Sequence, residues 1–234
     1  MRVLAFICYT ILFSMFPVNA PSDLIVHDMI VSKGKEVMLR VETKGKLFGK
    51  GGEIVEFFVD GKSIGKSLSG GDGFAFRHFA PLKTGLHRIT ARSDRDEGNG
   101  LLLVLKKGSR IIFVDVEGSL LERFSMKPRH RSQKAIKEIR KRFPVVFLQT
   151  GLLGIKAIKA WLKKNEFIEL PLVSWRQGAI FDEISEKGFK IKAIIGSPDV
   201  IKSAKEYKPM AFSFEEAEDA VEVKDWEEIS NKLR

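Results

Sequence analysis

The hydrophobic period of this chain changes near Ser109 from two residues to about 3.6, and this change limits the fold more than any other feature. From Leu24 to Leu105, short apolar or alternating runs are separated by connections rich in Gly and Asp, including the hairpin signal Asp60-Gly61. The runs predict strands at 24–26, 37–41, 54–59, 74–79, 87–91 and 101–105. Short strands at roughly ten-residue spacing predict an all-β sandwich over residues 21–107.

Downstream of Ser109 the sequence alternates between amphipathic helical patterns and short apolar runs. Helices are predicted at 133–142, 155–164, 179–187, 198–207 and 226–233, and strands at 111–114, 143–148, 190–196 and 209–214. Alternating strands and helices predict a mainly parallel sheet. We therefore expect a multidomain protein whose residues 108–234 form a three-layer, Rossmann-like α/β domain. The polar boundary Lys106–Arg110 is so short that the two domains should touch.

The first 20 residues differ from the rest of the chain. One positive charge precedes an unbroken apolar run, Val3–Phe13, and Ala20 is a small residue at a cleavage position. This pattern predicts a signal peptide over residues 1–20, although a single basic residue and Pro21 after the cut leave an uncleaved N-terminal anchor as the alternative. We expect an exported protein, periplasmic or secreted. The only cysteine, Cys8, lies within this apolar run. The exported part would therefore contain no cysteine and have no thiol chemistry.

Polar side chains follow three of the predicted strands in the second half. Asp115 and Glu117 come directly after the buried run Ile111–Val114, Thr150 follows the next strand, and Ser197 follows a third. Open α/β sheets bind ligands at the carboxyl ends of their strands, so these groups should converge at one edge. A strand followed by an acidic turn with no site is the alternative.

The first half resembles the bacterial immunoglobulin-like modules of exported proteins. The resemblance is carried by Val55–Gly65 with its Val-Asp-Gly turn, by Gly73–Phe76, and by Pro81–Ala91. It covers most of residues 23–106 and implies a sandwich fold. These motifs shape turns and core packing, so they carry no chemistry.

The second half resembles the haloacid dehalogenase (HAD) superfamily of phosphotransferases. Asp115-Val116-Glu117-Gly118-Ser119-Leu120 matches the first motif of that family, and Val145–Thr150 matches the second. The resemblance implies a HAD-like domain and a phosphatase that works through an aspartyl-phosphate intermediate. Asp115 would be the nucleophile, Glu117 the general acid and base, and Thr150 a hydrogen-bond donor to a phosphoryl oxygen.

The same resemblance implies further substrate contacts. Arg176 is the best positional match to the cationic third motif, although a solvated loop cation is the alternative. Gly118, Ser119, Gly151 and Arg123 are expected to line the substrate site.

The family also uses a magnesium ion, which would bridge Asp115 to the substrate. In the fourth motif, Ser197 and Ile201 stand where metal-binding acids belong. Asp199 is either a substitute metal ligand or, as we favour, an N-cap of the next helix. Glu117 also departs from the usual Asp and adds a methylene, and small positioning errors reduce catalysis.

These departures leave two functions open. The first is an exported phosphatase with a degenerate metal site that hydrolyses a phosphate monoester. The second is a weak or inactive HAD-like domain that acts as a binding or scaffold protein for an anionic ligand, lipid or cell-envelope partner. The layout resembles that of the lipin-type phosphatidate phosphatases, which by itself identifies no substrate.

The charge distribution points to an anionic partner. The chain carries a net charge of +10, and the gaps at 121–132 and 163–176 are too short for a large cap domain. Cations gather in the first gap and its helix at Arg123, Lys127, Arg129, Arg131, Lys134, Lys137, Arg140, Lys141 and Arg142. They would attract a phosphorylated small molecule, a phospholipid headgroup or an anionic membrane surface, or form only a solvated helix face. Nucleic acid is not expected, because aromatic residues are not interleaved with the cations.

Overall fold

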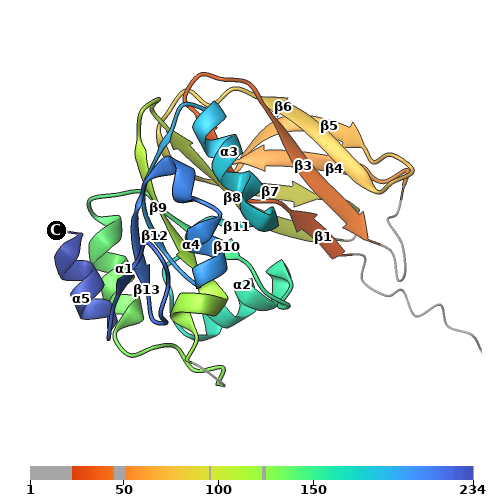
Figure 1. The fold of residues 1–234 in the computed structure, drawn as a ribbon. Coiled ribbons are helices and arrows are strands. Elements are labelled where there is room, and N and C mark those ends of the chain that lie inside the picture. The colour runs from red at the N-terminus through yellow and green to blue at the C-terminus, as the bar shows by residue number, and fades with distance from the viewer. Residues whose placement is uncertain (1–22, 45–50, 95, 123–124, 234) are drawn as a thin grey trace, which may run out of the picture.

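The computed structural model describes residues 23–44, 51–94, 96–122 and 125–233 (Figure 1). The predicted signal peptide and Arg123 lie outside these residues. No helix within the described ranges is both long and apolar enough to cross a membrane.

The first half forms a sandwich of two sheets with an immunoglobulin-like strand order. The three-stranded sheet has the order β1 (Asp23–Val26), β3 (Val37–Lys44), β6 (Phe74–Phe79). The five-stranded sheet has the order β2 (Met29–Ser32), β8 (Glu97–Leu105), β7 (Gly85–Arg92), β4 (Ile54–Val59), β5 (Lys62–Leu68). All pairs are antiparallel except β2 with β8. Leu39, Phe57, Ile89 and Leu102 are buried between the sheets, as alternating apolar residues require.

Two strands of the sandwich, β2 and β5, were not expected from the sequence. Strand β5 lies at the edge of its sheet, and none of its side chains is buried, so it carries no apolar alternation. Asp60 and Gly61 form the turn between β4 and β5. Their φ angles of 50° and 78° suit the Asp-Gly hairpin turn predicted there. Strand β2 follows β1 after only two residues, so the two together resemble one broken run.

The second half contains a six-stranded parallel sheet between two layers of helices. Its strand order is β11 (Leu172–Ser174), β10 (Val145–Gln149), β9 (Arg110–Asp115), β12 (Lys190–Ile195), β13 (Met210–Ser213), β14 (Val221–Glu222). This is the doubly wound order in which the connections reverse direction between β9 and β12. The short edge strands β11 and β14 were not expected, because three and two residues are too few to show a pattern.

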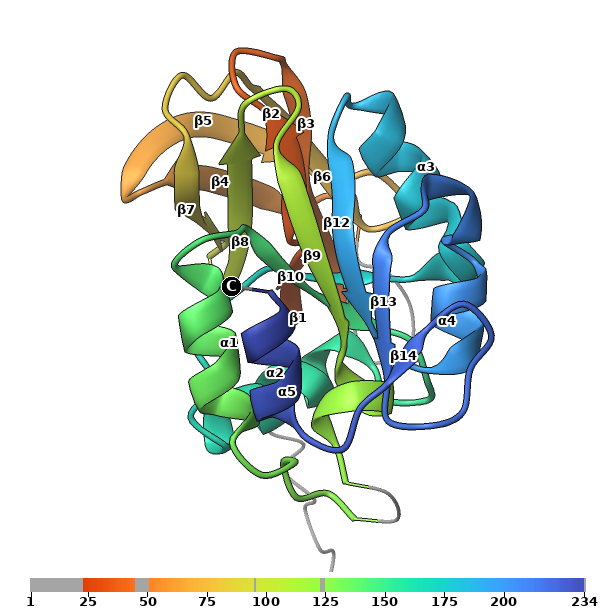
Figure 2. The same ribbon diagram turned by 60° about the vertical axis from the view of Figure 1, so that its left-hand side comes forward.

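Helices cover both faces of this sheet. One face is covered by α1 (Ser132–Arg140), α2 (Ile155–Lys164) and α5 (Trp226–Lys232), and the other by α3 (Ala179–Glu186) and α4 (Pro198–Lys202), as Figure 2 shows. Along β9, Ile112 and Val114 face the first layer while Ile111 and Phe113 face the second, and all four are fully buried. This double burial explains why the run is continuously apolar.

The two halves share part of their hydrophobic core. Leu103 and Leu105 of β8 pack with Ile111 and Phe113 of β9, and only four residues separate the two strands along the chain. The sandwich is therefore fixed against the α3 and α4 face, in contact as the short boundary predicted.

Asp28, which lies between β1 and β2, makes several of the polar contacts at this junction. Its fully buried carboxylate accepts hydrogen bonds from Lys159 Nζ at 2.7 Å and from the backbone N–H groups of Leu101 at 2.9 Å and Leu172 at 2.8 Å. Lys159 and Leu172 belong to the α/β domain and Leu101 to the sandwich. One carboxylate thus joins both domains.

The neighbouring His27 should make stability depend on pH. Burial, and after it the charge of Arg40, lower the pKa of His27 from 6.5 to about 4, so the folded protein favours the neutral ring. The unfolded chain therefore binds a proton more readily, and the free energy of unfolding should fall as pH decreases from 6.5 to about 4. We expect His27→Gln to remove this part of the pH dependence in urea titrations. His78→Gln, at an exposed histidine beside Glu36, is the control and should follow the parent; identical curves for all three proteins would contradict the prediction.

Candidate functional site

The strand ends singled out in the sequence meet at the point where the sheet order reverses. Asp115 ends β9, Thr150 follows β10 on one side, and Ser197 follows β12 on the other. Ligand sites of doubly wound sheets lie at such a position, because the helices leaving the two central strands turn to opposite faces. The structure thus brings together three of the polar groups that the sequence placed at one edge.

Asp115 is completely buried, and both of its carboxylate oxygens are occupied. Oδ1 accepts from Thr150 Oγ1 at 2.6 Å and from the Gly118 N–H at 3.0 Å. Oδ2 accepts from Ser197 Oγ at 3.0 Å and from the Ser197 N–H at 3.2 Å. Four donors from three segments of the chain satisfy this buried charge, as burial of an ion requires.

Gly118 and Ser119, which we expected to contact substrate, lie directly beside Asp115. They lie in a single π-helical turn, Val116–Leu120, where Ser119 is buried and its hydroxyl donates to the backbone carbonyl of Asp115 at 2.5 Å. A Cβ on Gly118 would lie 2.3 Å from Asp115 Oδ2, so only glycine permits this close approach.

Glu117 is turned toward the loop that follows β10 and not toward Asp115. Its Oε2 accepts from the Gly151 N–H at 2.6 Å and the Thr150 N–H at 3.4 Å, and its Oε1 accepts from the Leu153 N–H at 3.2 Å. A Cβ on Gly151 would lie 2.4 Å from Glu117 Oε1. The carboxylate therefore satisfies backbone donors ahead of α2, a role in which the longer side chain of Glu reaches further than Asp.

Arg176 is positioned at the domain junction. Its Nη2 donates to Glu183 at 2.5 Å, and the residue lines a cavity of about 470 Å³ together with Arg40 and Phe76 of the sandwich. Arg176 is not among the groups bonded to Asp115 in the described residues.

We expected Asp199 to be the N-cap of α4, and this prediction is wrong. The N-cap is Ser197, because Pro198 takes the first helical position and Asp199 lies in the first turn. Asp199 is exposed and lines a surface hollow with Lys202 and Lys205, whereas Ser197 bonds Asp115.

The side chains around Asp115 do not fit a magnesium site. Magnesium needs free carboxylate oxygens, yet both oxygens of Asp115 already accept hydrogen bonds, and the neighbouring Ser197 offers a hydroxyl and no second carboxylate. Within the described part of the chain, no three His, Cys, Asp or Glu residues are grouped so that they could hold a metal ion.

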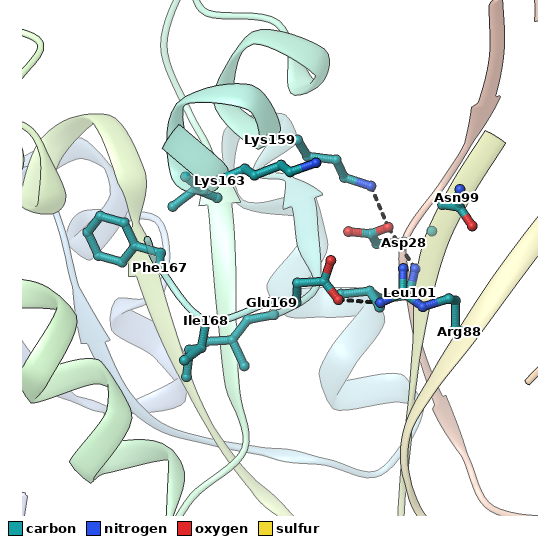
Figure 3. A pocket seen from close by; sticks show the side chains of 12 residues that line it. Asp28, Arg88, Asn99, Leu101, Lys159, Lys163, Phe167, Ile168 and Glu169 are labelled. Atoms are coloured by element: carbon teal, nitrogen blue, oxygen red, sulfur yellow. Dashed lines mark hydrogen bonds and ion pairs between the residues drawn. The ribbon is translucent and has the colours of Figure 1, made fainter. Parts of the chain in front are cut away.

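A cleft between the two domains, which the sequence reasoning missed, holds further charged groups (Figure 3). It has a volume of about 290 Å³ and contains the Asp28 and Lys159 pair and a second pair in which Arg88 donates to Glu169 at 2.5 Å. Its apolar wall includes Phe167. No local pattern marks these residues, because their partners are 81 and 131 positions away in the chain.

The comparisons with known proteins assign no family. No family model matches the chain, and no curated protein matches it. Similar solved structures include the fibronectin(III)-like modules of Clostridium thermocellum CbhA, at 16% identity over 36% of this chain and 97% of that chain, with a TM-score of 0.27. The D00-D0 domain of intimin is 14% identical over 36% of this chain and 46% of that chain, with a TM-score of 0.31. The titin M3 domain is 16% identical over 35% of this chain and 92% of that chain, with a TM-score of 0.26.

These scores are too low to carry an argument about function. The intimin fragment is matched over about half of its length. The immunoglobulin-like description of the first half is given by the strand order itself.

Proposed function

We propose that this chain is an exported, non-catalytic binding protein for an anionic partner, built on a phosphotransferase-like α/β domain. The observation that carries the proposal is the state of Asp115, whose buried carboxylate has four hydrogen-bond donors. A nucleophilic carboxylate must present an oxygen to the phosphorus atom. Here each oxygen would first have to leave two donors, and hydrogen bonds to charged groups stabilise by about 1.5–3 kcal/mol each.

The second carboxylate supports the same proposal. A general acid and base must lie within hydrogen-bond reach of the group whose proton it transfers. Glu117 accepts from three backbone N–H groups of the loop at 150–153, so its carboxylate holds this loop in place. Both acids of the phosphatase-like motif therefore stabilise the carboxyl edge of the sheet.

The anionic partner is inferred from charge. The net charge of +10 is large for a chain of this length, and cations of α1 such as Lys134 and Lys137 are exposed. Export is inferred from the signal-like pattern of residues 1–20.

A phosphatase is the second candidate. It is favoured by the position of Asp115 beside Thr150 and the Ser197 N–H at the strand ends, since these donors could bind a phosphoryl oxygen if one displaced the carboxylate. This function requires Asp115 to change its partners.

An activity measurement separates the two candidates. We expect the protein to hydrolyse p-nitrophenyl phosphate and phosphatidate, with or without magnesium, no faster than the Asp115→Asn variant, because neither acid is available. The initial rates of both proteins, prepared in parallel, provide the measurement. A magnesium-dependent rate that Asp115→Asn and Thr150→Val abolish while Asp199→Asn retains it would establish the phosphatase instead.

A further inference from the structure

A groove at the domain junction has an apolar floor. It has a volume of about 320 Å³ and lies between the sandwich and the turn that joins α1 to β10. Leu86 of β7 and Leu103 and Leu105 of β8 line it from the sandwich, and Phe143 and Pro144 line it from the turn. Leu86 and Phe143 are only partly buried, so the floor retains apolar surface in contact with water. The groove exists only because the shared core holds the two domains together.

Three consecutive cations, Arg140, Lys141 and Arg142, line the same groove, and all are exposed. Lys141 is paired with Glu138 at 2.7 Å, whereas Arg140 and Arg142 have no ion-pair partner among the described residues. The position of these residues at the end of α1 accounts for their positive charge, because a helix C-terminus favours cations. It does not account for an open apolar floor beside them.

Neighbouring charges strengthen the positive rim. Lys192 Nζ lies 5.9 Å from the centre of the Phe143 ring, which brings a fourth cation to the turn. Glu169, an acid adjacent to the lining residue Leu170, already forms an ion pair with Arg88. The groove therefore presents unneutralised positive charge at one side and hydrocarbon at the other.

We propose that this groove binds a single-chain anionic amphiphile, whose alkyl chain lies on the partly exposed Leu86 and Phe143 and whose phosphate or carboxylate meets Arg140 and Arg142. The inference rests on the proposed binding function and names its ligand class and site. A polyanion would use the cations and leave the floor exposed to water, and a neutral lipid would leave the arginines without a partner. An amphiphile uses both, and a volume of about 320 Å³ is at the small end of ligand pockets.

Calorimetric titration of the full chain with dodecyl phosphate below its micelle concentration tests the proposal. Inorganic phosphate supplies the charge without the chain, and dodecyl maltoside supplies the chain without the charge. We expect saturable one-to-one binding of dodecyl phosphate, with the other two probes at least about tenfold weaker. The double variant Arg140→Gln/Arg142→Gln should weaken dodecyl phosphate binding by about 30-fold, since each cation near an anionic headgroup contributes on the order of a fivefold gain.

The matched control is Lys163→Gln/Lys164→Gln, which removes the same charge from exposed residues at the end of α2. It should leave the affinity within about twofold. An equal loss in both double variants, or equal affinity for dodecyl phosphate and inorganic phosphate, would show general charge attraction and overturn the proposal.

A second measurement separates this inference from the proposed function. If the chain sediments with phosphatidylglycerol vesicles but does not bind dodecyl phosphate, the groove is not the site and the binding function stands. If it binds neither and shows the magnesium-dependent turnover described above, the proposed function fails as well.

Discussion

Replacing Asp28 by alanine should lower the free energy of unfolding by about 3–5 kcal/mol, the usual result of removing one partner from a buried ion pair. The buried side chain joins Lys159 of α2, the Leu172 N–H of β11 and the Leu101 N–H of β8. Without the carboxylate, two backbone donors and the Lys159 ammonium lose their acceptor at the domain junction. A buried donor left without an acceptor costs about 1–3 kcal/mol. The midpoint and slope of urea unfolding, followed by tryptophan fluorescence, measure the loss.

Asp60→Ala is the matched control for this variant. Asp60 also accepts from a side chain and a backbone N–H, at 2.6 Å from His87 and 2.9 Å from Arg88, but its side chain is 55% exposed. Water replaces these partners when the carboxylate is removed, and the φ of 50° adds some left-handed strain for alanine, so the loss should remain below about 2 kcal/mol. Equal losses in the two variants would contradict the role of Asp28 as a buried link between domains.

Asp115→Asn should lower the free energy of unfolding by about 3 kcal/mol, because the four donors around the side chain require an acceptor at every position. An amide has one oxygen and one NH₂ group, so the NH₂ would face the N–H of Ser197 or the N–H of Gly118. The charge that strengthens all four hydrogen bonds is lost as well. Chemical denaturation at neutral pH measures the change.

The direction of this change separates a structural carboxylate from a catalytic one. Active-site groups are often held at some cost in stability, so their replacement tends to leave stability unchanged or to raise it. Asp199→Asn, at an exposed carboxylate in the first turn of α4, is the control and should change the free energy of unfolding by no more than about 0.5 kcal/mol. An Asp115→Asn protein more stable than its parent would indicate a strained site and favour the phosphatase.

Much of the secondary structure could be predicted from local patterns. Strands β4 and β6 and helix α2 have the predicted bounds, because each combines a clear apolar period with Gly or polar residues at its ends. The strands that were missed, such as β5 and β11, lie at sheet edges and are exposed or very short. An edge strand is defined by its hydrogen-bonded neighbour, which a local pattern does not encode.

The position of the candidate site could be predicted from the sequence, but the hydrogen-bond partners of its side chains could not. Asp115, Thr150 and Ser197 follow buried strands, and the carboxyl ends of parallel strands meet at one edge, so their convergence follows from the order of elements. The hydrogen-bond partners of Glu117 do not follow from that order. They depend on the path of the loop after β10 and on the direction of one side chain.

By itself, the sequence determined where the chain changes from a sandwich to an α/β sheet and that Asp115 ends a strand buried on both faces. It could do so because hydrophobic period and burial are local properties of a segment. Only the tertiary structure decided that Asp115 is saturated by Thr150 and Ser197, which are 35 and 82 positions away, and that Asp28 links the two domains. Hydrogen-bond partners are set by distance and direction in space, and residues so far apart in sequence acquire these only when the chain is folded.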